Sequence, residues 1–177
     1  MIQRNKMRKT VITILFCTSL FALGESTQTL ESDFVQTIVD DKNATITYEG
    51  IMLAKRPSMA LWHYSKPVEK SVFIRNNTIT IVEPELEQAI VKKLDNTVDI
   101  LAIITSARKE SKGHYTAFYH EKEYHITMDD KRLKSIHYND AFDNHVTITF
   151  SKQRINHKID DVRFEANIPE DFDVIKD

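Results

Sequence analysis

The sequence predicts a mainly β domain built as an antiparallel meander. From Thr45 onward the apolar residues mostly alternate with polar ones, which is the period of a strand with one buried face. Turn residues such as Asn76-Asn77 recur at short intervals and suit tight hairpins, because asparagine tolerates a positive φ. About eleven such stretches can be counted, with the spacing of hairpin-connected strands.

The first 24 residues have the pattern of a cleaved secretory signal. An apolar run over 11–23 ends at Ala22-Leu23-Gly24, where small residues suit a signal peptidase. This run is too short for a membrane-spanning helix, which needs roughly 20 residues. We therefore expect a signal peptide over 1–24 and one domain over 25–177, with an uncleaved N-terminal anchor as the alternative. Four cations precede the apolar run: Arg4, Lys6, Arg8 and Lys9.

Composition excludes several classes of protein. Without the four signal cations, 20 Lys and Arg face 26 Asp and Glu, and this net charge of −6 argues against nucleic-acid binding. Cys17 lies in the expected signal, so the mature chain has no disulfide and must be held together by its core. Gly50 and Gly113 are too far apart to form a phosphate-binding loop or a G-x-S-x-G elbow. We expect no cofactor.

Two segments predict helices rather than strands. Residues 27–34 indicate a short helix that leads into a strand at 35–39. Residues 97–107 indicate a second helix, with Asn96 or Thr97 as N-cap and Asp99 in the first turn. This second helix is apolar over much more than one side, so it must be covered on both sides or must cover something that is not always present. Its apolar residues are Val98, Ile100, Leu101, Ala102, Ile103 and Ile104.

The remaining elements follow from alternation and turns. A charged stretch at 108–112 suggests a mobile loop or a solvated connection, and a hairpin is expected from 115–120 and 123–128. Turns are expected at Asp129-Asp130-Lys131 and at 140–144. Val162 and Phe164 alternate with charged residues and predict a last strand.

No constellation of residues predicts catalysis or metal binding. His120 and His125 in "HEKEYH" are five residues apart, whereas a helical zinc motif needs four, and the local pattern is a hairpin. Pairs of acidic residues, such as Asp160-Asp161, fall in turns where Asp is a common residue. We therefore expect neither an enzyme nor a metal site.

Arg56 stands where two apolar strands meet, and this position calls for an explanation. Tyr48, Met52, Ala54 and Arg56 share one face of a strand. After Pro57, which ends the strand's hydrogen bonding, a second strand places three side chains on one face: Ala60, Trp62 and Tyr64. A guanidinium beside such an apolar face needs carbonyl or carboxylate partners, and the C-terminal carbonyls of an overlying helix would serve. An inconsequential turn arginine is the alternative.

The order of several short motifs resembles the LolA family of periplasmic lipoprotein carriers over 34–175. The motifs are Phe34-Val35-Gln36, Gly50 followed by Lys55-Arg56-Pro57, Trp62 with Pro67, Glu83-Pro84-Glu85-Leu86-Glu87-Gln88, and Ile168-Pro169 to Val174-Ile175. Val82 stands where the family usually has an aromatic residue, and Asn76-Asn77 replaces a common Asp-Gly turn. Both differences concern the fine shape of the cavity rather than the fold.

The resemblance implies an incomplete antiparallel β-barrel with a lid of short helices over an apolar cavity. It also implies a monomeric periplasmic carrier of a Gram-negative bacterium, which takes lipoproteins by their acyl chains from an inner-membrane releasing transporter. Delivery would be to an outer-membrane acceptor lipoprotein, or by the carrier itself. Arg56 matches the arginine that holds the lid. The expected ligand-binding residues are Tyr48, Met52, Ala54, Ala60, Trp62, Tyr64, Val98, Leu101 and Ile104.

Two other functions remain open at this stage. A sensor or interaction domain of the same fold could recognise lipidated proteins or glycolipids, although such relatives normally carry additional domains. A lipid hydrolase is disfavoured because the chain has no nucleophile motif.

Overall fold

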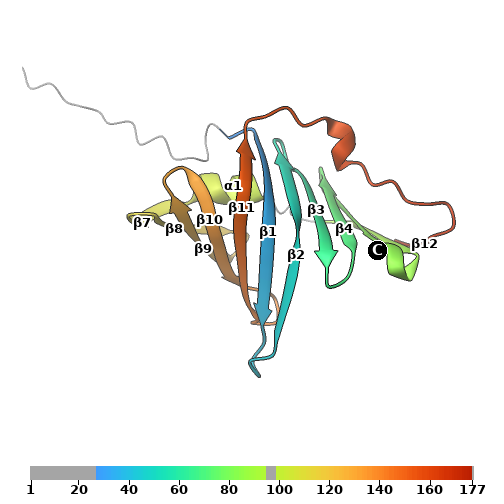
Figure 1. Ribbon diagram of the computed structural model, residues 1–177, viewed down its shortest axis with the longest axis horizontal. Coiled ribbons are helices and arrows are strands. Elements are labelled where there is room, and N and C mark those ends of the chain that lie inside the picture. The colour runs from blue at the N-terminus through green and yellow to red at the C-terminus, as the bar shows by residue number, and fades with distance from the viewer. Residues whose placement is uncertain (1–26, 95–98, 177) are drawn as a thin grey trace, which may run out of the picture.

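The computed structural model describes residues 27–94 and 99–176, which form one twelve-stranded sheet and one α-helix (Figure 1). The expected signal peptide lies outside these residues. No helix in the described ranges is long and apolar enough to cross a membrane. The strands are β1 Thr29–Val39, β2 Thr45–Lys55, β3 Met59–Lys66, β4 Lys70–Arg75, β5 Thr78–Glu83, β6 Gln88–Lys93, β7 Arg108–Ser111, β8 His114–Tyr119, β9 Lys122–Asp129, β10 Arg132–Asn139, β11 His145–Ile155 and β12 Asp173–Lys176.

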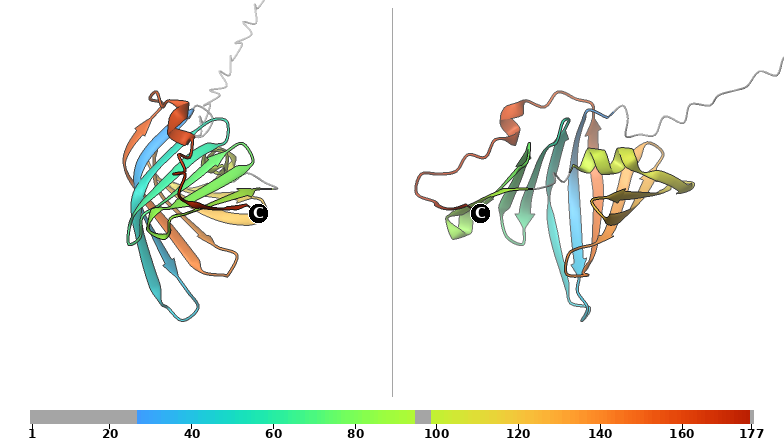
Figure 2. Two further views of the ribbon diagram at one scale, coloured as in Figure 1. Left: turned by 90° about the vertical axis from the view of Figure 1, so that its right-hand side faces the viewer. Right: turned by 180° about the vertical axis from the view of Figure 1, so that it is seen from behind.

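The sheet is curved but open. Its strand order is β12-β6-β5-β4-β3-β2-β1-β11-β10-β9-β8-β7, and all neighbours are antiparallel except the parallel pair β12 and β6. The mainly β class is thus confirmed, with twelve strands in place of about eleven. The sheet does not close into a barrel, because β12 and β7 are its two ends and do not pair with each other. Figure 2 shows the curvature in its left-hand view.

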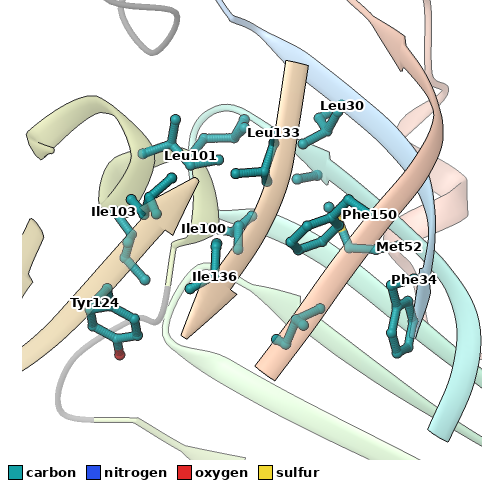
Figure 3. Packing of buried hydrophobic residues seen from close by; sticks show 14 of the residues in the cluster. Leu30, Phe34, Met52, Ile100, Leu101, Ile103, Tyr124, Leu133, Ile136 and Phe150 are labelled. Atoms are coloured by element: carbon teal, nitrogen blue, oxygen red, sulfur yellow. The ribbon is translucent and has the colours of Figure 1, made fainter. Parts of the chain in front are cut away.

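The two faces of the sheet carry different side chains. Directly paired residues of antiparallel strands point to the same side, so the pairs Phe34 with Gly50 and Met52 with Trp62 define one face, here called the inner face. Leu53 with Leu61 belongs to the opposite, outer face. The main hydrophobic cluster lies on the inner face, partly beneath the helix (Figure 3).

The helix expected at residues 27–34 is wrong, because β1 begins at Thr29. Leu30, Ser32 and Phe34 are all buried on the inner face, which is strand periodicity. Both edges of β1 are hydrogen-bonded, to β2 and to β11. This pairing on two sides outweighs the helical preference of the local sequence.

The second predicted helix exists but is shorter than expected. Helix α1 covers Ile100–Ser106, and its N-cap is Asp99, not Asn96 or Thr97, which lie outside the described residues. The Asp99 carboxylate accepts hydrogen bonds from the backbone N–H groups of Leu101 at 2.9 Å and Ala102 at 3.1 Å. The expected lid of several short helices is reduced, in the described part of the chain, to this one α-helix.

The expected strand at Val162 and Phe164 is also wrong. These residues form the 3₁₀-helix η2, Asp161–Phe164, in the segment that joins β11 to β12 across the outer face (Figure 1). Phe164 is 1% exposed and packs in a second cluster with Leu53 and Ile159, whereas Val162 is 66% exposed. The alternation of apolar and charged residues at 162–165 wrongly predicted a strand, because Phe164 is buried and Val162 is not.

Most turn predictions are confirmed. Asn76-Asn77 joins β4 to β5, with Asn76 at φ 54°, and the hairpin of β8 and β9 falls where expected. Turns also occur at 129–131 and 140–144. The charged stretch at 108–112 is not a loop, since Arg108–Ser111 form the edge strand β7. A second short 3₁₀-helix, η1, covers Pro84–Leu86 between β5 and β6.

Candidate ligand-binding face

Helix α1 packs its apolar side chains onto the inner face of the sheet. Ile100, Leu101, Ile103 and Ile104 are all at most 9% exposed, and they join a cluster with residues of β1, β2 and β8 to β11 (Figure 3). Figure 2 shows in its right-hand view that the helix crosses only part of the sheet. The helix is therefore covered by the sheet on its apolar side and leaves other strands without a helical cover.

Arg56 connects the sheet to α1. Its Nη2 donates to the Leu101 carbonyl at 3.3 Å and to the Thr105 hydroxyl, and its Nε donates to the Thr27 carbonyl at 2.9 Å. Thr105 in turn donates to the Leu101 carbonyl at 2.6 Å. The contacted carbonyl is in the first turn of the helix, so the expectation of C-terminal carbonyl partners is wrong. Leu101 and Thr105 lie one turn apart on the same side, which lets one guanidinium reach both.

The N-terminus of α1 has a second link to the sheet. The Ser58 hydroxyl, in the β2–β3 turn, donates to the Asp99 carboxylate at 3.3 Å. Arg56 and Ser58 thus reach α1 from the same corner of the sheet, the end of β2 and the turn after it. This corner acts as the support on which the helix rests.

The space directly beneath α1 is filled. A hollow of only about 10 Å³, the room of roughly one water molecule, lies between the helix and the sheet. The expected open cavity is absent from this position because Leu101 and Ile104 occupy it. A pocket of about 570 Å³ lies elsewhere, around the β10–β11 turn, and its lining of His, Asp and Glu side chains does not suit an apolar chain. The small hollow beneath α1 is lined by Thr27, Leu30, Leu101, Ile104, Leu133, Gln153 and Ile155.

The inner face continues beyond α1 as a half-buried apolar surface. Strand register places the inner-face residues of β3 to β6 in rows, for example Trp62 beside Val72, Val72 beside Ile81, and Ile81 beside Ile90. Trp62, Val72, Ile81 and Ile90 are all only partly buried, and none of them is charged. Such a contiguous apolar surface indicates a binding site for an apolar partner.

A group of aromatic side chains lies between the part of the inner face that α1 fills and the half-buried part on β3 to β6. The Phe34 ring packs edge-on against Trp62 at 5.0 Å and Tyr64 at 5.1 Å between ring centroids. Gly50 permits this arrangement, because a Cβ there would lie 2.9 Å from the Phe34 ring. Lys70 Nζ lies 4.7 Å from the Tyr64 ring centroid and 5.0 Å from that of Tyr48. The polar edge of the aromatic group is therefore positively charged.

Tyrosine hydroxyls on this face remain protonated. Burial raises the pKa of Tyr138 to about 12, with the neighbouring Tyr124 as a second cause. Burial also raises the pKa of Tyr64 above its usual value, and Tyr138 and Tyr48 add to the effect. Both side chains are therefore neutral hydrogen-bond donors throughout the physiological pH range.

The expected ligand-binding residues of β2 and β3 share the inner face, and Leu101 and Ile104 of α1 pack onto it, but these residues differ in exposure. Met52, Ala54, Ala60, Leu101 and Ile104 are buried. Tyr48, Trp62 and Tyr64 are half-buried, and Val98 lies outside the described residues. Sequence reasoning missed Leu30 and Phe34 on β1, because a helix was expected there, and Phe150, whose alternation with Ser151 on β11 was a usable signal. No group of three or more His, Cys, Asp or Glu side chains within 27–94 and 99–176 is placed to hold a metal ion.

A curved antiparallel sheet with a half-covered apolar inner face is the arrangement of a protein that binds apolar chains. Residues 25–124 match the family described as outer membrane lipoprotein carrier protein LolA. An outer-membrane lipoprotein carrier protein of Campylobacter jejuni is 36% identical over 96% of this chain and 100% of its own length. That of Wolinella succinogenes is 36% identical over 85% of this chain and 88% of its own length.

The chain belongs to the LolA family of outer-membrane lipoprotein carriers, which are transport proteins and not enzymes. A solved structure of an uncharacterized conserved protein from Thermus thermophilus has the same fold, with a TM-score of 0.52. It is 10% identical in sequence and covers 86% of this chain and 92% of its own. This likeness supports the fold alone.

Proposed function

We propose that this protein carries lipoproteins through the periplasm by burying their acyl chains on the inner face of its sheet, with α1 as a movable lid. The observation that carries the proposal is the continuity of that face. It extends from the core beneath α1 to the half-buried row of Trp62, Val72, Ile81 and Ile90, while Lys70 and Lys92 of the same face lie in the two neighbouring rows. The signal-like residues 1–24 support export, and the family carriers supply the destination, the outer membrane.

Ligand entry beneath α1 requires the helix to move, because its own side chains fill that space. Exposing each of the four buried side chains of α1 costs about 1.5–3 kcal/mol, or roughly 6–12 kcal/mol together. An acyl chain of roughly 14 carbons gains about 0.8 kcal/mol per buried methylene, or about 11 kcal/mol. The two terms are of similar size, so one chain can replace the helix without being held irreversibly.

Arg56 biases this exchange toward the closed, empty state. Its hydrogen bonds to Leu101 and Thr105 exist only while α1 rests on the sheet. Hydrogen bonds of charged donors contribute about 1.5–3 kcal/mol each. Arg56 therefore acts as a latch that weakens ligand retention and assists release to an acceptor.

The proposed ligand face is tested by a pair of substitutions on one strand. Ile81 lies on the inner face of β5, and Thr80 on the outer face; both are half-buried. Because a carboxylate is costly among methylene groups, Ile81→Asp should weaken binding of a fluorescent acyl probe at least about tenfold. Thr80→Asp, the matched control, should leave the dissociation constant unchanged.

Fluorescence titration measures both constants, and thermal unfolding shows whether the two variants are equally stable. Equal probe affinity in Ile81→Asp and the parent protein would exclude this face as the acyl site. A transfer assay from loaded carrier to acceptor membranes distinguishes a carrier from a sensor domain, since a sensor would retain its ligand.

A further inference from the structure

Four tyrosines lie along the inner face where its apolar side chains end, and this group is here called the tyrosine belt: Tyr48, Tyr64, Tyr124 and Tyr138. On β3, Tyr64 is followed by the exposed Lys66, which pairs with Glu49 on the outer face. On β9 the next inner-face residue beyond Tyr124 is the exposed Lys122. On β10 the strand ends one residue after Tyr138. Figure 3 shows the Tyr124 hydroxyl pointing away from the side chains of α1.

Curvature brings the belt residues together. Tyr124 and Tyr138 have ring centroids 5.2 Å apart, and those of Tyr48 and Tyr64 are 5.6 Å apart. Tyr138 is also among the groups that raise the pKa of Tyr64, although β2, β1 and β11 lie between their strands. The hydroxyls thus gather around the inner face instead of being spread along a flat sheet.

Several belt hydroxyls have unused hydrogen-bonding capacity. The Tyr64 hydroxyl donates to the Gln36 side chain at 3.0 Å. Within residues 27–94 and 99–176, the hydroxyls of Tyr48, Tyr124 and Tyr138 have no protein hydrogen-bond partner. Tyrosine combines an apolar ring with a polar tip, so it suits a boundary where one end of a ligand is apolar and the other polar.

The length of the apolar face fits an acyl chain. Ala54 lies at the end of β2 near α1, and Tyr48 lies six residues further back on the same face. At about 3.3 Å per residue this distance is roughly 20 Å along the strand. The hydrocarbon core of a bilayer is about 30 Å thick, so the chains of one leaflet span roughly 15 Å. A chain that starts at the belt would therefore end near α1.

We propose that the tyrosine belt binds the ester and amide carbonyls that join acyl chains to a lipoprotein, so that the chains point from the belt toward α1. This inference rests on the proposed carrier function and adds an orientation and a head-group site to it. Carbonyl oxygens accept hydrogen bonds from neutral hydroxyls. Burial raises the pKa of Tyr64, Tyr124 and Tyr138 and so favours the uncharged form of these three side chains. Lys70, held over Tyr48 and Tyr64, adds a cationic donor at the same level.

The test compares two synthetic triacylated lipopeptides that differ only in the linkage of their chains. One has the natural ester-linked and amide-linked chains, and the other keeps the amide but has ether links in place of the two esters, so that it lacks the ester carbonyls and gains no charge. The variant is Tyr48→Phe/Tyr138→Phe, which removes two hydroxyls that have no partner in the described residues and leaves the rings. Tyr115→Phe, on the inner face of β8 outside the belt, is the matched control.

Loss of two hydrogen bonds should weaken binding of the carbonyl lipopeptide about tenfold or more and change that of the ether lipopeptide less than twofold. An unchanged constant for the carbonyl lipopeptide, or equal loss for both ligands, would overturn the belt as a head-group site and leave the carrier function standing. Failure of the parent protein to bind either lipopeptide would instead contradict the carrier function. Melting temperatures of the variants show that each is folded.

Discussion

Arg56 is the side chain that links the end of β2 to helix α1. It lies next to Lys55, but the two residues point to opposite faces. Lys55 donates on the outer face to the Ile159 carbonyl at 2.8 Å and pairs with Asp161 at 2.6 Å. Arg56 donates to α1. Two neighbouring cations therefore contact different parts of the molecule, one helix α1 and the other the segment that follows β11.

We predict that Arg56→Leu binds an acylated ligand more tightly and releases it more slowly than the parent protein. Loss of even one charged hydrogen bond, worth about 1.5–3 kcal/mol, destabilises the closed state and corresponds to roughly tenfold to a hundredfold in affinity. Titration with an acyl probe and the rate of transfer to acceptor membranes measure the two effects. Lys55→Met is the control and should alter neither; normal transfer by Arg56→Leu would refute the latch.

At the scale of elements, α1 is the part of the inner face best suited to move. It has only seven residues, too few for a helix that is stable without tertiary contacts. It is held by its apolar side chains, by Arg56 and by the cap that Asp99 provides. The strands beneath it are paired on both edges, so they have no comparable freedom.

We expect Asp99→Ala to loosen α1 without loosening the sheet. Loss of an N-cap costs about 0.5–2 kcal/mol, and this cost falls on the helix. Native-state hydrogen exchange should show faster exchange of the Ile103 amide, which donates to the Asp99 carbonyl, and unchanged exchange in the centre of β1. Asp99→Asn retains a capping oxygen and should resemble the parent protein. Equal exchange of α1 in all three proteins would show that the cap does not hold the helix.

At the scale of the whole molecule, the two faces of the sheet have separate hydrophobic clusters, and we expect only the inner face to take part in binding. The segment between β11 and β12 crosses the outer face, where Leu53, Ile159 and Phe164 form a compact cluster. Arg75 and Glu165 form an ion pair beside it. This cluster lies on the side of the sheet opposite to α1, so its packing contributes to folding and not to the ligand face.

Phe164→Ala should therefore lower the free energy of unfolding by about 3–5 kcal/mol and leave acyl-probe affinity unchanged. Urea denaturation and probe titration at a temperature where the variant is folded measure the two quantities. Val162→Ala, two residues away and mostly exposed, should change stability by less than about 0.5 kcal/mol. A large loss of affinity in Phe164→Ala would mean that the outer face also controls the site.

The local sequence was sufficient to predict the β class, most hairpins, the apolar helix and a shared face for Met52, Ala54 and Trp62. These features depend on side-chain periodicity and turn chemistry, which neighbouring residues specify. Helix 27–34 and strand 162–165 were predicted wrongly, because partners more than a hundred residues away decide whether β1 is extended and whether Phe164 is buried.

Only the tertiary structure decided which carbonyl Arg56 contacts, that α1 fills the space beneath it, and that Tyr64 and Tyr138 face one inner surface. These facts depend on sheet curvature, which is the sum of twists over many strands and is not encoded by any one of them. The amino-acid sequence by itself determined an apolar face and an arginine at its edge. The curved sheet gave that face one part that α1 fills and another, on β3 to β6, that is only half-buried.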